Sequence, residues 1–209
     1  MISETIERTQ EETPFPIRHG VFVAVAGPSG AGKDSLIDYA RPRLGALAAD
    51  IVFARRIITR PPEAGGEAHD AMDAEAFERA RAEGRFALSW RAHGLGYALP
   101  ASVDATMHAG GVVVANVSRA VVPDIKVRYA HVAPVLITAT PEVLAERLAR
   151  RGRETREEVL ARLARGTDSG LLIDDAITID NSGPLEVAGE RFLGVLRRAA
   201  AWSDIGGMD

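Results

Sequence analysis

Hydrophobic residues fall into short runs that alternate with amphipathic stretches along most of the chain. The first run, 21–26, contains only Val, Phe and Ala, and further apolar runs lie at 112–115 and 132–139. Short apolar runs of this kind are typical of strands that are buried on both faces. Such strands, alternating with helices, predict an α/β fold in which helices cover both faces of a parallel sheet.

Capping residues and helical spacing predict the elements between these strands. Thr140 with Pro141 is a typical helix start, and Thr155 with Glu158 forms a capping box. Residues 1–19 are polar and contain prolines, which predicts a loose N-terminal arm. Helices are expected over 34–44, 73–83, 100–109, 141–150, 155–165 and 185–198, and further strands over 51–53, 57–58, 86–90 and 176–179.

A glycine-rich segment directly follows the first apolar run. Glycines let the backbone approach an anion closely, and the N–H groups of a loop and of the helix after it point at phosphate oxygens. Lys33 adds a positive charge over the terminal phosphates. The order of strand, loop and helix therefore predicts a P-loop NTPase with an ATP site. The expected ATP-binding residues here are Gly27, Pro28, Ser29, Gly30, Ala31, Gly32, Lys33, Asp34 and Ser35.

The residue after the lysine departs from the common phosphate-loop pattern. Asp34 stands where a Ser or Thr hydroxyl usually meets Mg²⁺. One interpretation is that Asp34 binds the ion through its carboxylate, directly or through water. The other is that Ser35 supplies the hydroxyl. The sequence leaves both open, so both residues are candidate Mg²⁺ ligands.

Composition and charge narrow the class of protein. The 209 residues are 46% hydrophobic and 26% charged, which fits one globular domain with a small attached lobe. A net charge of −4 gives no reason to expect a nucleic-acid partner, and the lack of cysteine excludes disulfides and cysteine metal sites. No apolar run is long enough for a membrane span, and the first residues do not resemble a signal peptide. A cytoplasmic protein is therefore expected.

Arginines cluster at the end of the helix that starts at Pro141. Arg147 and Arg151 lie one turn apart on the same helical face, and a glycine follows that offers a hinge. Forked guanidinium groups can stabilise the charge on a transferring phosphoryl group, and a closing lid excludes water. The alternative is a solvated helix end whose cations complement the helix dipole. We expect a lid at about 150–156, and the candidate catalytic residues are Lys33, Arg147, Arg151 and Arg162.

The chain carries a series of short motifs, which are Gly27–Ser35, Ile58–Pro61, Phe86–Trp90, His93–Tyr97, Arg150–Arg153 and Ile179–Asn181. These motifs occur in the order in which guanylate kinases carry them. The resemblance spans about 21–198 and implies a guanylate-kinase-like kinase domain over 20–200, with an acceptor-binding lobe at about 55–99 and a C-terminal tail at 201–209.

Four features narrow the resemblance, and they are Gly-Lys-Asp-Ser at 32–35, the segment 86–90, Ser118-Arg119-Ala120 and the segment 151–154. With these features the chain most resembles, within that superfamily, the ribose 1,5-bisphosphate phosphokinases. The resemblance implies transfer of a phosphoryl group from ATP, with Mg²⁺, to a small sugar phosphate. It also implies that Asn181 lies near the adenine.

The acceptor region departs from the guanylate kinase pattern. Guanylate kinases have a Glu that reads guanine before the Trp, and this chain has Ser89 there; His69 replaces a phosphate-binding tyrosine, and Arg56 replaces a small polar residue. We expect a pocket for a doubly phosphorylated sugar, with Arg91 and His93 nearby, although Arg55 and Arg91 could equally be surface residues. The candidate substrate-binding residues are Arg56, Arg60, His69, Ser89 and Tyr97.

Two other functions stay open at this point. One is a guanylate kinase or another nucleoside monophosphate kinase, against which the lack of a carboxylate at position 89 argues. The other is a non-catalytic binding module, against which Lys33 and the lid arginines argue. The sequence does not report the oligomeric state and leaves a homodimer open.

Overall fold

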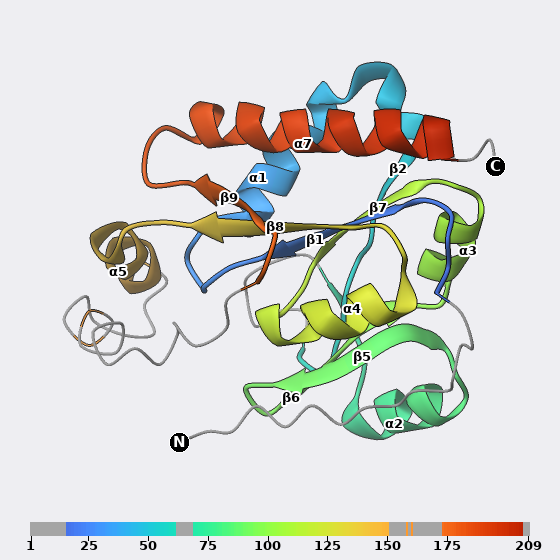
Figure 1. Ribbon diagram of the computed structural model, residues 1–209. Coiled ribbons are helices and arrows are strands. Elements are labelled where there is room, and N and C mark those ends of the chain that lie inside the picture. Colours follow the sequence, from blue (N-terminus) through green and yellow to red (C-terminus); the bar gives the residue numbers. More distant parts are fainter. Residues whose placement is uncertain (1–15, 62–68, 151–157, 159, 161–172, 207–209) are drawn as a thin grey trace.

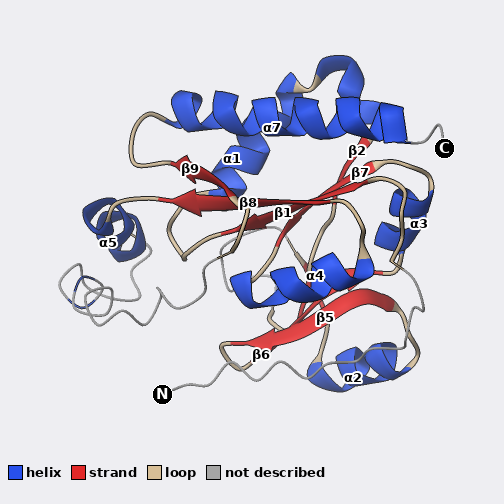
Figure 2. Ribbon diagram, viewed as in Figure 1, coloured by secondary structure: helices blue, strands red, loops and turns tan. Residues whose placement is uncertain are grey.

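The computed structural model describes residues 16–61, 69–150, 158, 160 and 173–206. At the centre of this part of the chain is a parallel sheet of five strands in the order β2-β7-β1-β8-β9, with helices on both faces (Figures 1 and 2). The α/β fold predicted from the apolar runs is therefore confirmed. The strands are β1 (Val21–Ala26), β2 (Ile51–Phe53), β7 (Val112–Asn116), β8 (Val132–Thr138) and β9 (Ile177–Asp180).

The two faces of β1 pack against different helices. Its odd-numbered valines join a core with α1 and α7, whereas its even-numbered residues join a core with α3 and α4. Phe22, for example, stacks on Tyr129 at the end of α4, with ring centroids 5.1 Å apart. Because every residue of β1 is buried, the strand is a rigid base for the loop that follows it. These helices are α1 (Lys33–Ala40), α3 (Ser102–His108), α4 (Val122–Arg128) and α7 (Leu185–Gly206).

A smaller sheet lies on the α4 side of the main one (Figure 1). Its strands follow the order β4-β3-β6-β5, and the hairpin between β5 and β6 turns at His93 and Gly94, both with positive φ. Asp73 caps the adjoining helix by accepting a hydrogen bond from the Ala76 N–H. The elements are β3 (Ile57–Ile58), β4 (Asp70–Ala71), α2 (Ala74–Ala82), β5 (Phe86–Ala92) and β6 (Leu95–Pro100).

Some expected boundaries were wrong. The helix expected over 34–44 ends at Ala40 and continues as the 3₁₀ turns η1 (Arg41–Arg43) and η2 (Gly45–Ala49), because Pro42 has no N–H for a helical hydrogen bond. The last helix, expected to end at 198, continues to Gly206. Strand β6 and helix α4 were not expected at all.

The last residues of the expected N-terminal arm are fixed to the body of the protein. Ile17 is buried, donates its N–H to the Arg128 carbonyl at 2.9 Å, and accepts from the Ala130 N–H at 2.9 Å. The chain is therefore already fixed to the body of the protein at Ile17, before β1 begins.

Helix α5 (Pro141–Ala149) begins as expected, with the Thr140 hydroxyl accepting from the Val143 N–H. The lid expected at 150–156 and the helix expected over 155–165 lie outside the described residues, except for Arg150 and two isolated positions. Within the described chain, no helix combines the length and apolar character that a membrane span requires.

Candidate active site

The phosphate loop joins the end of β1 to the start of α1. Gly27, Gly30 and Gly32 all have positive φ, which side chains rarely tolerate. A Cβ at Gly27 would collide with the Ile137 carbonyl of β8, and one at Gly32 would collide with the Asn181 amide. These glycines therefore bring the loop close to its neighbours, and the N–H groups in the first turn of α1 make this end of the sheet suitable for an anion.

Lys33 is the first residue of α1 and folds back over the loop. Its ammonium donates hydrogen bonds to the carbonyls of Gly27, at 2.8 Å, and Pro28, at 3.1 Å. The positive charge is thus held over the beginning of the loop. This is the side of the molecule where the sequence predicts the terminal phosphates.

Asp34 is partly buried, and its carboxylate contacts the neighbouring strand. The Nδ2 amide of Asn116, the last residue of β7, donates to Asp34 Oδ1 at 2.9 Å. Because a carboxylate only accepts hydrogen bonds, the contact also fixes the orientation of the amide. Ser35, the other candidate Mg²⁺ ligand, is exposed.

Arg147 and Asn181 lie together against the phosphate loop. Arg147 donates to the carbonyls of Gly30 and Ala31, each at 3.4 Å, and to the carbonyl of Asn181 at 2.9 Å. The amide of Asn181 donates to the Ala31 carbonyl at 2.7 Å. Both side chains therefore support the loop backbone. A contact between Arg147 and the transferred phosphoryl group stays a prediction.

The turn around Asn181 is held to α5. Ser182 Oγ accepts from the Thr140 N–H at 2.9 Å, and Asp180 accepts from both the N–H and the hydroxyl of Ser182. These bonds to Ser182 lower the pKa of the Asp180 carboxyl. The β9–α7 turn, α5 and the phosphate loop thus form one connected unit.

Two expected acceptor-binding residues, Arg60 and His69, meet in the small sheet. The His69 ring is buried, with Nε2 placed 3.1 Å from the Arg60 carbonyl and Nδ1 3.5 Å from Arg60 Nη2. A carbonyl can only accept, so Nε2 carries the proton and Nδ1 can accept from the guanidinium. Arg60 Nε is buried and has no hydrogen-bond partner within the described residues.

Arg56 and Tyr97 form a second contact in the same lobe. The Arg56 guanidinium lies 5.3 Å from the centroid of the Tyr97 ring, which is within range of a cation–π interaction. Tyr97 in turn stacks on Trp90, with centroids 5.6 Å apart and the planes nearly parallel. The cation therefore lies beside a rigid aromatic pair.

Other residues expected near the acceptor are placed elsewhere. Ser89 pairs with Ala98, one position along from the stacked Trp90–Tyr97 pair, so alternation puts its side chain on the opposite sheet face from Tyr97. Arg91 forms an ion pair with Glu78 of α2 at 2.6 Å. His93 occupies the exposed hairpin turn. The structure thus does not bring Arg91 and His93 to Arg56 and Arg60, and Arg55 instead pairs with Asp70 at the surface.

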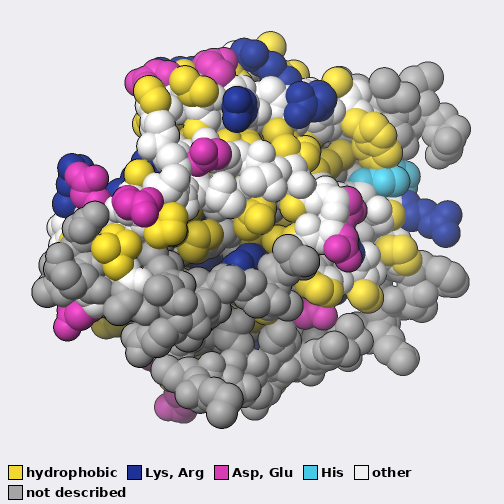
Figure 3. Space-filling view, turned by 60° about the vertical axis from the view of Figure 1, so that its left-hand side comes forward, with side chains coloured by type: hydrophobic (Ala, Val, Ile, Leu, Met, Phe, Trp, Pro, Cys, Tyr) yellow, Lys and Arg dark blue, Asp and Glu magenta, His cyan; other side chains and the backbone are white. Residues whose placement is uncertain are grey.

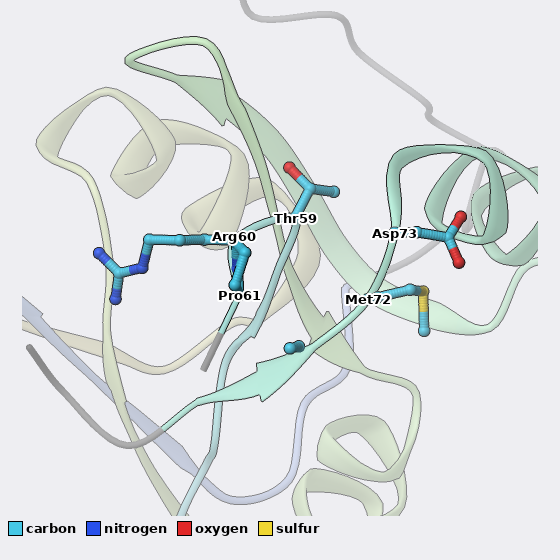
Figure 4. Close-up of a pocket in the computed structure, with 6 residues that line it drawn as sticks. Thr59, Arg60, Pro61, Met72 and Asp73 are labelled. Carbon is cyan, nitrogen blue, oxygen red and sulfur yellow. The ribbon is translucent and has the colours of Figure 1, made fainter. Parts of the chain in front are cut away.

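A cavity of about 260 Å³ lies at the edge of the small sheet, between the segments 59–61 and 71–73. Figure 4 shows that the Arg60 side chain extends away from Met72 and Asp73 on the other side of this cavity. Arg60 is itself one of the residues that line this cavity, and its guanidinium points away from the side formed by Met72 and Asp73.

Two of the candidate catalytic residues, Arg151 and Arg162, lie outside the described residues, and Arg150 forms an exposed pair with Glu146 of the same helix. The side of the molecule toward α5 shows Lys or Arg and Asp or Glu side chains interspersed (Figure 3). Among the described residues on this face, neither the basic nor the acidic side chains gather into a single patch (Figure 3).

A family model described as an AAA domain matches residues 23–163. The ribose 1,5-bisphosphate phosphokinase PhnN of Chelativorans sp. (strain BNC1) is 67% identical over 205 residues, which cover 98% of each chain. The chain belongs to the ribose 1,5-bisphosphate phosphokinase family.

Further comparisons agree with this family and with the fold. A protein of the same name from Brucella melitensis biotype 2 (strain ATCC 23457) is 51% identical, covering 91% of this chain and 97% of the relative. Among solved structures, a guanylate kinase from Anaplasma phagocytophilum has a TM-score of 0.59 at 19% identity and covers 86% of each chain. This second likeness shows that the chain has the fold of that guanylate kinase.

Sequence reasoning missed one residue of this site. Asn116 directly follows the apolar run 112–115, and a polar residue at the carboxyl end of a buried parallel strand is a usable signal of a site residue. Its contact with Asp34 depends on the pairing of β7 with β1, which the sequence alone does not specify.

Proposed function

We propose that the protein transfers the γ-phosphoryl group of ATP to the 1-phosphate of ribose 1,5-bisphosphate, giving ADP and 5-phospho-α-D-ribose 1-diphosphate. The observation that carries this proposal is the 67% identical relative of that name, because the match covers 98% of both chains. The residues that we propose bind ATP and the acceptor all fall within the kinase domain expected over 20–200. The ATP requirement also supports an expectation that the protein works in the cytoplasm.

The phosphate loop supplies the donor side of the proposed site. Lys33 would move from the loop carbonyls to the β and γ phosphates, and the loop N–H groups would bind their oxygens. Asn181 Oδ1 is buried and has no partner within the described residues. An acceptor of this kind suits an amino group such as that of adenine, which supports the expected position of Asn181.

Mg²⁺ is expected with ATP, and the residues present fit it. Among the described residues no group of three or more His, Asp or Glu could hold a metal ion. This fits Mg²⁺, which is usually bound by one or two carboxylates together with substrate phosphates. Asp34 would supply the carboxylate, and Ser35 is the alternative. When bound, the ion would neutralise negative charge on the phosphates.

The small lobe supplies the acceptor side. Arg60 has a buried Nε without a described partner, and the Arg56 guanidinium lies beside Tyr97. Two separately positioned guanidinium groups suit an acceptor with two phosphates. Position 89 is a serine, so it offers no carboxylate to pair with guanine.

The reaction needs no catalytic base. A phosphate monoester has a second pKa near 6, so the attacking oxygen of the acceptor is already ionised at neutral pH. The protein then has to align the two phosphates and neutralise their charge. Lys33 would act at the donor phosphates, and Arg56, Arg60 and Tyr97 would hold the acceptor. Arg147, Arg151 and Arg162 would contact the transferred group.

A direct comparison of acceptors tests this function. ADP formation from ATP and Mg²⁺ is measured with ribose 1,5-bisphosphate, ribose 5-phosphate, GMP, AMP and dTMP at equal concentrations. We expect ribose 1,5-bisphosphate to give the highest kcat/KM. Ribose 5-phosphate should be inactive even if it binds, because it lacks the 1-phosphate that is the acceptor.

Each of the other outcomes of this comparison would indicate a different function. If GMP gave the highest kcat/KM, the protein would be a guanylate kinase with an altered base pocket. If AMP or dTMP gave the highest kcat/KM, both ribose 1,5-bisphosphate and GMP would be excluded as the main acceptor, and the protein would be a kinase for another acceptor. If ATP turnover did not depend on any acceptor, the non-catalytic binding module would be the better interpretation.

A further inference from the structure

Asn116 connects the phosphate loop to the strand beside it. It is the last residue of β7, which pairs with β1 in parallel so that Asn116 lies opposite Val25. Its residue surface is only 7% exposed. From this position it donates the 2.9 Å hydrogen bond to Asp34, the residue directly after Lys33. Two residues that are 82 positions apart in sequence therefore meet at the end of the phosphate loop.

The chemistry of this pair reverses a common arrangement. In many P-loop phosphotransferases, a Ser or Thr on the loop and an Asp on a nearby strand hold Mg²⁺ together. Here the carboxylate is on the loop, at Asp34, and the neutral side chain is at the strand end, at Asn116. Both arrangements bring one negative charge to the ion. They differ only in which element carries it.

We propose that Asn116 is a positioning residue that holds the Asp34 carboxylate toward the Mg²⁺ of bound ATP. In this pair the loop carries the carboxylate and the strand carries the neutral side chain, which is the reverse of the common arrangement. This inference rests on the proposed binding of ATP and Mg²⁺ at the loop, but not on the identity of the acceptor. The amide can orient the carboxylate without neutralising it, because Nδ2 donates a hydrogen bond and the side chain carries no charge.

This reversal predicts that the residues suited to the two positions depend on each other. A carboxylate at both positions would place two negative charges within hydrogen-bond distance, and these charges would repel each other. A neutral residue at both positions would leave the ion without a protein carboxylate. Asn at 116 is therefore the appropriate partner for Asp at 34, whereas Asp at 116 would suit Ser at 34.

Three variants of the full chain test the proposal. Asn116→Ala removes the hydrogen bond, Asp34→Ser removes the carboxylate, and the double variant Asp34→Ser/Asn116→Asp moves the carboxylate to the strand. Asp38→Ser is the matched control, because Asp38 is an exposed carboxylate one turn further along α1. ATP binding is measured by calorimetry with and without Mg²⁺, and thermal unfolding without either ligand reports whether each variant folds.

We expect Asn116→Ala to weaken Mg²⁺-dependent ATP binding by about 10- to 100-fold, as is typical when the partner of a metal ligand is lost. Binding of ATP without Mg²⁺ should not change. Asp34→Ser should lose at least as much, the double variant should regain about tenfold over Asp34→Ser, and Asp38→Ser should match the unaltered protein.

Two results would overturn the proposal. One is Mg²⁺-dependent binding by Asn116→Ala that equals that of the unaltered protein. The other is a double variant that binds no better than Asp34→Ser, and this comparison decides the matter if Asn116→Ala does not fold. Because the binding assay contains no acceptor, a protein that showed the expected Mg²⁺ pattern but did not phosphorylate ribose 1,5-bisphosphate would disprove the proposed function and leave this inference standing.

Discussion

At the scale of single residues, His69 shows how a buried side chain can position a group that we propose binds the substrate. Both ring nitrogens face Arg60, one toward its carbonyl and one toward its guanidinium. The ring therefore holds the backbone and the side chain of the same arginine. We interpret His69 as a residue that positions Arg60 for the acceptor phosphate.

His69→Phe keeps a flat ring in the buried position and removes both of these contacts. Each lost hydrogen bond is worth about 1 kcal/mol, so we expect KM for the sugar bisphosphate to rise by about tenfold or more, with little change in KM for ATP. Steady-state kinetics with each substrate varied in turn would measure this. His93→Asn is the control, since His93 lies in the exposed turn with positive φ, which Asn tolerates. An equal rise in both KM values would contradict the positioning role.

At the scale of secondary-structure elements, the buried strands of the main sheet were predictable from the sequence. The segments in which Gly or Pro interrupts the hydrophobic pattern were not. β1, β7 and β8 are continuous apolar runs, and their burial follows directly from that pattern. β6 was missed because Leu95–Pro100 contains Gly and Pro and has no clear alternation. α4 was missed because Pro123 stands in its first turn, where a proline is tolerated but gives an ambiguous signal.

The residues of the site divide in the same way. The phosphate loop is a local motif, so sequence alone located it. The contacts of Asp34 with Asn116, and of Arg147 with the loop carbonyls, join residues that are distant in the chain and depend on strand order. Local pattern carries no information about such pairs.

Helices α3 and α4 are joined through one acidic residue. Asp104 of α3 accepts a hydrogen bond from the buried Tyr129 hydroxyl at 2.7 Å and forms an ion pair with Arg128. Tyr129→Phe should therefore lower the free energy of unfolding by about 2 kcal/mol, the cost of losing a hydrogen bond to a charged acceptor. Denaturant unfolding measures the change. Tyr39→Phe, which removes an exposed hydroxyl contact with Glu190, should change it by less than about 0.5 kcal/mol.

The difference in unfolding free energy between the unaltered protein and Tyr129→Phe should also depend on pH. Burial and the contact with Asp104 raise the pKa of Tyr129 above its ordinary value of 10. The unfolded chain then ionises at a lower pH than the folded one, so the stabilisation is complete below pH 10 and declines as pH rises above it. The gap between the unfolding free energies of the two proteins should narrow above pH 10. A constant gap would contradict the raised pKa.

At the scale of the whole molecule, the two sheets share a hydrophobic core. Trp90 and Leu99 of the small sheet belong to the same buried cluster as Met107 of α3 and Val113 of β7. In the proposed function the main sheet binds the donor and the small sheet binds the acceptor (Figure 1). The shared core therefore fixes the base of the acceptor lobe relative to the phosphate loop.

Because Trp90 stacks on Tyr97 in the proposed acceptor lobe, its fluorescence should report binding of the acceptor. The chain has two tryptophans: Trp90 is 3% exposed in the acceptor lobe, and Trp202 is 43% exposed near the end of α7. In a Trp202→Phe variant all tryptophan fluorescence would come from beside the Arg56 guanidinium. Titration with ribose 1,5-bisphosphate should then change the emission, whereas the Trp90→Phe variant, emitting only from Trp202, should stay constant. A response carried by Trp202 instead would mean that the acceptor binds outside this lobe, so a fluorimeter could locate the binding site before any rate is measured.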